Sequence, residues 1–472
     1  MNTIWLLTGS QHLYGDEALQ EVAAHSEEVG RYLNGALTSG VRILVKPVCT
    51  TREQIEQICM EATTDDQCVG VMAWMHTFSP AKMWINGLKV LGKPLLHFHT
   101  QFNDKIPFDT IDMDFMNLNQ SAHGGREFGY ICTYLGIERK VVVGHWKDHG
   151  VLSELDIWIR ACIGRASMKK VRVARFGDNM RSVAVTEGNK VMAESDLNIV
   201  VDGYGIGDVL TFKPEIHSAE VQALVQEYHK NYDCASITSE QSISVEEAAA
   251  IEIAIERFLT KGNYQAFTTT FEDLHGFHQL PGLGVQRLME KGYGFAAEGD
   301  WKTAALLYVV KNMSVGLEGG TSFMEDYTYH FTENDDEDVV LGAHMLEICP
   351  SIAAEKPSLQ VHPLGIGGKE DPARLVFNGT VGPALNISLV ELRGRYRLVV
   401  NKVESVVVPE MPHLPVARVL WKPEPSLKES AKAWIKAGGS HHTVYTQAIG
   451  KDHIVDLSEL LGLELIVIES RK

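Results

Sequence analysis

Hydrophobic and polar positions follow two different periods along the first third of the chain. Short apolar runs predict buried strands at residues 4–8, 41–45, 69–75 and 94–99. Between the first two runs, apolar residues recur at helical spacing over residues 16–34, and Thr51 precedes the next helix as a capping residue. Strands that alternate with helices predict a mostly parallel sheet with helices on both faces.

A second cycle of the same kind follows a predicted helix at residues 152–162. Strands are expected at 171–175, 197–201 and 265–269, and helices at 218–229 and 245–259. The last helix carries one apolar face, formed by Ala248, Ile251, Ile255 and Leu259. This cycle predicts a second α/β domain.

The last third of the chain changes to strand composition. Strands are expected at 339–348, 374–381, 385–392 and 395–403, with Arg393-Gly394 as a hairpin turn. The fold class is therefore α/β, with two doubly wound parallel-sheet domains followed by a mainly β domain. The expected domains cover residues 1–168, 169–317 and 318–472.

Composition and charge narrow the class of protein. The chain has 472 residues, 45% of them apolar, and a net charge of 43 − 61 = −18. Such a chain can bury a core in each domain, and its acidic balance argues against a nucleic-acid partner. No apolar run approaches the ~18 residues of a membrane helix, and the N-terminus lacks the basic start of a signal peptide. Seven cysteines without a Cys-x-x-Cys pair indicate free thiols, so we expect a cytoplasmic location and no membrane.

Two common motifs receive no support. Gly203, Gly205 and Gly207 follow a predicted strand, but Asp208 stands where a dinucleotide fingerprint requires its third glycine. A turn is the better interpretation of that segment. The Gly-x-Ser-x-Gly pattern of nucleophile-elbow hydrolases is absent from the sequence.

Acidic and histidine residues gather in four segments of the second half. These segments contain Glu298 with Asp300, Glu325 with Asp326, His344 with Glu347, and His441 with His442. Two carboxylates and two imidazoles suit a borderline divalent cation such as Mn²⁺. Their spacing matches no local motif, so a second interpretation stays open. In it, Glu298 and Glu325 cap helices, while His344, expected within a strand, and His442 form hydrogen bonds in the core.

Polar loops of the first domain are candidates for ligand binding. Residues 9–15 end a strand, where open α/β sheets bind ligands, and residues 117–127 are similarly polar and contain glycine. The alternative for the second loop is a helix start capped by Ser121. His97 and His99, which share one face of a strand, are expected to be structural.

At these segments the sequence resembles the bacterial L-arabinose isomerase family. The resemblance covers all three expected domains and rests on Gly-Ser-Gln-His-Leu-Tyr-Gly at 9–15, Asn-Gln-Ser-Ala-His-Gly-Gly-Arg-Glu at 119–127, Arg-Phe-Gly-Asp-Asn-Met-Arg at 175–181, Glu-Gly-Asp-Trp-Lys-Thr-Ala-Ala at 298–305, Thr-Ser-Phe-Met-Glu-Asp-Tyr-Thr-Tyr-His at 321–330 and Gly-Gly-Ser-His-His-Thr at 438–443. It implies a barrel-like third domain and a homohexamer with active sites between subunits.

The resemblance also implies roles for particular residues. One Mn²⁺ per subunit would be bound by Glu298, Glu325, His344 and His442, and the two glutamates would form the catalytic acid/base pair. The substrate-binding positions would be Gln11, Leu13, Tyr14, Gln120, Met180, Phe271 and His441, together with His123 from a neighbouring subunit.

The implied reaction converts L-arabinose to L-ribulose, and D-galactose to D-tagatose, through a metal-stabilised enediol. A carboxylate would move the proton from C2 to C1, and a second carboxyl group would serve the oxygens. A related metal-dependent isomerase acting on L-fucose or another aldose is the nearest alternative. A sugar-binding module without catalysis is a second alternative, and a metallohydrolase is disfavoured because no leaving-group acid can be named.

Overall fold

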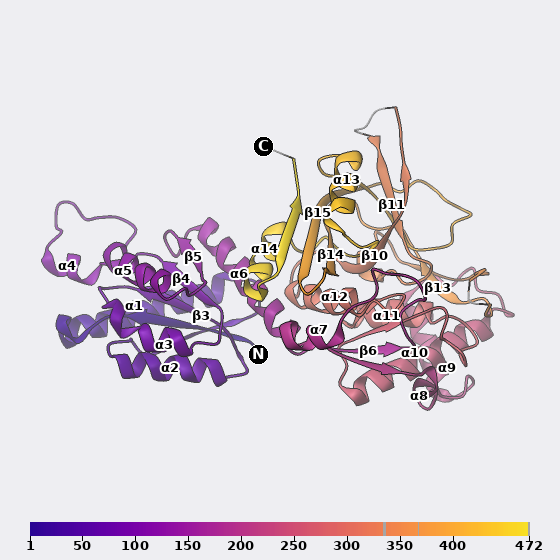
Figure 1. Ribbon diagram of the computed structural model, residues 1–472, viewed down its shortest axis with the longest axis horizontal. Helices are drawn as coiled ribbons and strands as arrows, with labels where there is room; N and C mark the ends of the chain where they lie inside the picture. The colour runs from indigo at the N-terminus through magenta and orange to yellow at the C-terminus, as the bar shows by residue number, and fades with distance from the viewer. Residues whose placement is uncertain (334–336, 367, 471–472) are drawn as a thin grey trace. The chain divides into compact units, whose positions relative to one another are not determined.

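The computed structural model describes residues 1–333, 337–366 and 368–470 (Figure 1). The chain divides into two compact units, Met1–Ile163 and Gly164–Lys472. Residues 334–336, 367 and 471–472, all in the third expected domain, lie outside the described residues. The boundary expected at residue 317, inside the second unit, stays a prediction.

The first unit contains a five-stranded parallel sheet. Its strands, in spatial order, are β2 (Arg42–Val45), β1 (Thr3–Gly9), β3 (Cys68–Met75), β4 (Leu95–His99) and β5 (Lys140–Val143). The main helices are α1 (Gly15–Ala36), α2 (Arg52–Thr64), α3 (Ile85–Val90), α5 (Ser121–Tyr134) and α6 (His149–Met168). The expected capping role of Thr51 is confirmed, because its side chain accepts a hydrogen bond from the backbone N–H of Gln54. The strand β5 was not among the expected ones.

The order of this sheet reverses direction between β1 and β3, which makes the gap between their carboxyl ends a topological switch point. The two following loops are joined there, since Thr77 Oγ1 donates a hydrogen bond of 2.7 Å to Ser10 Oγ. Residues 9–15 therefore lie where a sheet of this type binds ligands, as expected.

The second unit begins with a four-stranded parallel sheet. Its spatial order is β7 (Val200–Tyr204), β6 (Arg172–Phe176), β8 (Ala266–Thr269) and β9 (Gly294–Ala296). The accompanying helices include α7 (Lys190–Leu197), α9 (Ala219–Asn231), α10 (Ser242–Gly262), α11 (Gly282–Glu290) and α12 (Trp301–Met313). The strand expected at 197–201 begins later, because Leu197 ends α7 and Asn198 adopts a left-handed conformation with φ 58°.

An antiparallel barrel follows in the same unit. Its six strands are β14 (Gly382–Glu391), β17 (His442–Thr446), β10 (Thr321–His330), β11 (Val339–Ala343), β16 (Arg418–Pro423) and β15 (Tyr396–Val406). The ring closes because β14 pairs with both β17 and β15, while β18 (Glu464–Ile468) adds to β15 in parallel. This confirms the barrel-like expectation, and Arg393-Gly394 forms the predicted turn, with both residues at positive φ.

The strand expected at 339–348 is shorter in the structure, and this difference changes the position of His344. The run 339–348 forms a strand only to Ala343, so the prediction that His344 lies within a strand is wrong. After Ala343, the side chain of Glu347 accepts hydrogen bonds from the backbone N–H of Leu346 and from His344. These local bonds replace the ladder that a continuing strand would need.

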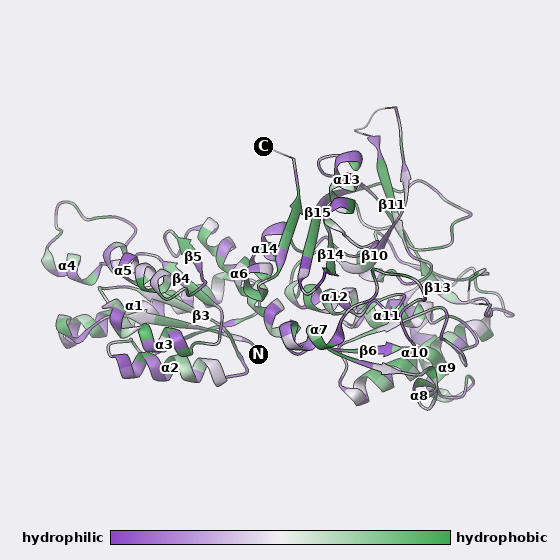
Figure 2. Ribbon diagram, in the orientation of Figure 1, coloured by the Kyte–Doolittle hydropathy of each residue, from purple (hydrophilic) through white to green (hydrophobic). Residues whose placement is uncertain are grey.

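Helices and barrel of the second unit share one hydrophobic core. Tyr228 of α9 and Ala249 of α10 belong to the same buried cluster as Val340, Trp421 and Tyr445 of the barrel strands. The strands β14 and β15 are correspondingly hydrophobic over most of their length in Figure 2. None of the described helices combines the length and the apolar composition that a membrane crossing requires.

Candidate active site

A tight turn between β9 and α12 holds Glu298 at the carboxyl end of the parallel sheet. Glu298 and Gly299 have φ of 59° and 80°, and a side chain at Gly299 would come within 2.6 Å of the Asn179 Cα. The residue that caps α12 is Asp300, whose carboxylate accepts from the backbone N–H of Thr303. The interpretation of Glu298 as a helix cap is therefore wrong.

The barrel brings the other predicted ligands together through strand register. Glu325 of β10 lies directly opposite His442 of β17, and on its other side it lies opposite Ala343, the residue before His344. Because Glu325 is in the middle of a strand, its interpretation as a helix cap is also wrong. Antiparallel pairing thus joins three sequence segments at one place.

The side chains of these residues face one another. The Oε2 atom of Glu298 lies 3.4 Å from His441 Nε2 and 3.8 Å from His442 Nε2, and Glu325 Oε2 lies 3.7 Å from His344 Nε2. The rings of His344 and His442 are 6.1 Å apart. One possible metal-ligand atom from each of Glu298, His441 and His442 lies within 4.8 Å of the other two. His441 therefore lies among the predicted ligands.

Two further carboxylates hold the histidines from behind. The Nδ1 of His442 donates to Asp300 Oδ2 over 3.1 Å, and the Nδ1 of His344 donates to Glu347 Oε2 over 2.5 Å. A carboxylate on the far nitrogen is the usual partner of a metal-binding histidine, because it fixes the ring and its tautomer. Both acids lie in the segments that the sequence singles out, but no sequence signal predicted this role for them.

The donor set fits a divalent cation. His442 is fully buried, and its Nε2 has no hydrogen-bond partner among the described residues. Because the hydrogen on Nδ1 forms the hydrogen bond to Asp300, Nε2 has a free lone pair, which points toward Glu298. Two imidazole nitrogens and two carboxylates, without a thiolate, are a set that suits Mn²⁺.

Neighbouring charges and hydrogen bonds shift the pKa values of several residues in the site. The hydrogen bond from His441 is the largest effect that lowers the pKa of Glu298, and the charges of His442, His441 and His344 add to it against the opposing effect of burial. That hydrogen bond with Glu298 likewise raises the pKa of His441. Burial would lower the pKa of His344, but the charge and the hydrogen bond of Glu347 raise it above its ordinary value. The site therefore favours positive charge next to its carboxylates.

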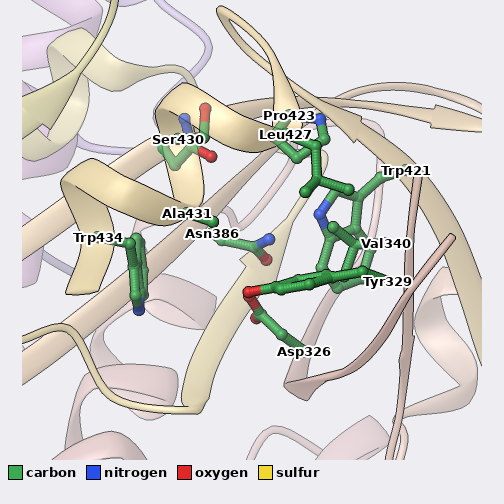
Figure 3. Close-up of a pocket in the computed structure, with 11 residues that line it drawn as sticks. Asp326, Tyr329, Val340, Asn386, Trp421, Pro423, Leu427, Ser430, Ala431 and Trp434 are labelled. Carbon is green, nitrogen blue, oxygen red and sulfur yellow. The ribbon is translucent and has the colours of Figure 1, made fainter. Parts of the chain in front are cut away.

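A small cavity lies on the other face of β10, between barrel strands and α13 (Leu427–Ala437) (Figure 3). Its volume is about 30 Å³, and Asp326, Tyr329, Asn386, Trp421 and Trp434 are among the residues around it. Burial, followed by the charge of Glu325, raises the pKa of Asp326 to about 7. Since one water needs ~10–15 Å³ of such space, the cavity can hold water but not a sugar.

Two predicted substrate positions border the cluster of acids and histidines. Phe271 follows β8, and its ring lies parallel to the ring of His344 at 6.1 Å. Met180 follows β6, and its backbone N–H donates to the backbone oxygen of Glu298 over 3.0 Å. Both residues come from loops at the carboxyl end of the parallel sheet, next to Glu298.

The remaining predicted substrate residues belong to the first unit. Gln120 Nε2 donates to Tyr14 OH over 3.0 Å, and Gln120 Oε1 lies 3.1 Å from His123 Nδ1. His123 is exposed and stacks on Phe78 at 4.4 Å.

Gln11 and Leu13 lie in the loop that carries Tyr14, and Leu13 is 81% exposed. The helix start expected in this segment is confirmed, since α5 begins at Ser121, but the expected capping role of Ser121 is wrong, because Gln120 is the cap residue. Of the predicted substrate residues in the first unit, Tyr14, Gln120 and His123 are the ones that hydrogen bonds connect to one another.

Comparison with known proteins gives full-length matches. The chain matches family models described as the L-arabinose isomerase N-terminal, central and C-terminal domains over residues 1–170, 172–316 and 320–464. It is 54% identical to "L-arabinose isomerase" from Herpetosiphon aurantiacus, covering 99% of this chain and 93% of the relative. Identity is 55% to the protein of that name from Geobacillus stearothermophilus (98% and 94% covered) and 52% to the one from Klebsiella pneumoniae (99% and 94% covered).

Proposed function

Because this chain belongs to the L-arabinose isomerase family, we propose that it converts L-arabinose to L-ribulose, and D-galactose to D-tagatose, through an enediol. The observation that carries the proposal is the pairing of Glu298 and Glu325 with His442 and His344, at 3.8 and 3.7 Å. Two carboxylates that each lie beside an imidazole of one site can move a proton between neighbouring carbons and another between their oxygens.

One Mn²⁺ per subunit would be held by Glu298, Glu325, His344 and His442. When bound, the ion stabilises the negative charge that develops on the two sugar oxygens. The orphaned Nε2 of His442 and the carboxylates behind both histidines support this assignment.

The residues of the chain divide the remaining work. One of the two glutamates takes the proton from C2 of the aldose and returns it at C1, while the other carboxyl group passes a proton between O1 and O2. His441 hydrogen-bonds Glu298 and would bind a sugar hydroxyl there. Phe271 and Met180 border the same space and would help to exclude water.

Assembly and location complete the proposal. His123 is exposed, so it is available to complete the site of a neighbouring subunit in a homohexamer. The seven cysteines are all free, and six are buried, which supports a reducing, cytoplasmic location. We also propose that the chain has three domains, with boundaries near residues 168 and 317.

The proposal is tested by assaying ketose formation from L-arabinose, D-galactose and L-fucose. Metal-stripped protein should be inactive and should regain activity with added Mn²⁺, with L-arabinose as the best substrate. Faster turnover of L-fucose would favour the alternative isomerase. In deuterated water, the enediol route should place solvent deuterium at C1 of L-ribulose, and binding of all three sugars without turnover would contradict an isomerase.

A further inference from the structure

A buried lysine lies next to the acid and histidine cluster. Lys302 is the second residue of α12 and is 1% exposed. Its Nζ donates to the backbone oxygens of Thr186 and Glu187, over 3.0 and 2.5 Å, and lies 3.4 Å from Asp300 Oδ1. A buried ammonium group is costly unless it is paired, so these three contacts explain how the fold tolerates it.

The carboxylate next to Lys302 is the one that holds His442. Asp300 is also 1% exposed, and its Oδ2 accepts from His442 Nδ1 and from Thr303 Oγ1 over 3.1 and 2.7 Å. In the described part of the chain, Lys302 is the charged partner of Asp300, and His442 contacts the same carboxylate through its ring nitrogen. Without Lys302, the neutral tautomer of His442 and one threonine would face a buried negative charge alone.

The same ammonium group anchors the loop that follows β6. The backbone oxygen of Thr186 accepts from Lys302 and from Asn179 Nδ2, and that amide also donates to the backbone oxygen of Gly299 over 3.2 Å. Met180, one residue after Asn179, is a predicted substrate position. Lys302 therefore contacts both the support of His442 and the loop beside the substrate.

We propose that Lys302 is a positioning residue that acts through Asp300 to keep the His442 ring oriented, with Nδ1 against Asp300 and Nε2 toward the divalent cation. This inference rests on the proposed function. It assigns Lys302 no contact with substrate and no proton transfer. Its effect is to hold a buried carboxylate in place behind a metal ligand, and loss of such support typically weakens metal binding ~10–100-fold.

The test compares Lys302→Met with Lys311→Met. Lys311 lies on the same helix and donates to the backbone oxygen of Thr321 over 2.9 Å, so it is a lysine anchored to a carbonyl but outside the site. The Kd for Mn²⁺, measured by calorimetry on the full-length protein, should rise ~10–100-fold in Lys302→Met and stay within about twofold in Lys311→Met. The sugar kinetics of Lys302→Met should show a lower kcat at saturating Mn²⁺ with a smaller change in KM.

A double-mutant cycle separates the contact of Lys302 with Asp300 from its two contacts with backbone oxygens. If Lys302 acts through Asp300, adding Lys302→Met to Asp300→Asn should change the Kd for Mn²⁺ little, because the charge to be balanced is gone. If Lys302→Met alone fails to fold, this comparison still tests the inference, because a further large rise in Kd on the Asp300→Asn background would overturn it. An equal Kd in wild type and Lys302→Met, or an equal loss with and without Asp300, would overturn the inference. Failure of the wild-type protein to bind Mn²⁺ would instead overturn the proposed metal site, and the inference with it.

Discussion

Two pairs of buried histidines, one in each unit, differ in what lies against their rings. His76 and His97 of the first unit and His344 and His442 of the second unit are all at most 4% exposed. Burial lowers the pKa of His76 to about 3 and that of His97 to about 4. In the second unit, carboxylates bond the Nδ1 atoms of both histidines.

The neighbours of the first pair are rings, not acids. His76 stacks on Trp74 at 4.4 Å and bonds His25, while His97 packs edge-on against Phe128 and His99. Burial of an imidazole therefore only keeps it neutral. A carboxylate behind the ring is what orients it and prepares its other nitrogen for a cation. The difference distinguishes structural histidines from candidate ligands.

The largest effect is expected from Glu298→Gln. Loss of a general acid or base typically lowers the catalytic rate ~10²–10⁴-fold. We therefore expect kcat for L-arabinose to fall at least ~100-fold, while the protein still binds the sugar. The matched control is Glu256→Gln, which removes a carboxylate paired with Lys291 at 2.7 Å outside the site. Steady-state kinetics on both variants test this, and a Glu298→Gln enzyme within tenfold of wild type would contradict the proposed mechanism.

A second experiment asks whether the two units contribute to one site from different subunits. Inactive His123→Ala and inactive Glu298→Ala proteins are mixed under conditions that allow subunit exchange. If sites are shared in a closed oligomer, roughly a quarter of them will carry both intact residues, and activity should return to about that level. A mixture that stays inactive after confirmed exchange would show that each subunit builds its whole site.

The comparison of histidines predicts different effects on metal binding. His344→Asn should weaken Mn²⁺ binding ~100-fold or more, since removing a ligand should cost at least as much as removing its outer support. His76→Asn should leave the Kd for Mn²⁺ unchanged and lower only the stability of the first unit. Calorimetric titration of both variants decides this, and equal losses would remove the distinction drawn between the pairs.

The smallest effect concerns the pH dependence of stability. The pKa of His97 is about 4 in the folded protein, and an unfolded histidine titrates near 6.5. Above pH ~6.5 both states are neutral, and between ~6.5 and ~4 only the unfolded state gains the proton. The free energy of unfolding of the first unit should therefore fall by up to ~1.4 kcal/mol per pH unit as the pH falls through this window, because of His97.

Hydrogen exchange of amides in β3 and β4 at pH 7, 6 and 5 would measure this loss, after correction for intrinsic exchange. His97→Phe should flatten the dependence, whereas His149→Gln, a change at an exposed histidine of α6, should not. An unchanged slope in His97→Phe would show that His97 does not carry the effect.

Much of the fold could be predicted because its signals are local. Apolar periodicity located β1, β3, α1 and α10 to within a few residues. Thr51 indicated a helix start because its side chain can cap the helix, and Arg393-Gly394 indicated a turn of the backbone. The motif resemblance located the candidate site residues, while composition alone could only suggest a mixed donor set.

The type of most elements and the identity of the acids and histidines could thus be predicted from the residues alone. Folding of the whole chain was needed to show that Glu325 lies opposite His442 and that His344 lies beyond the end of β11. The same holds for Asp300 and Lys302, which lie behind the site. Asp300 and His442 are 142 residues apart in the chain. The physical reason is that contacts over such separations depend on strand register and on the packing of α12 against the barrel, and neither leaves a periodic signal in the residues between them.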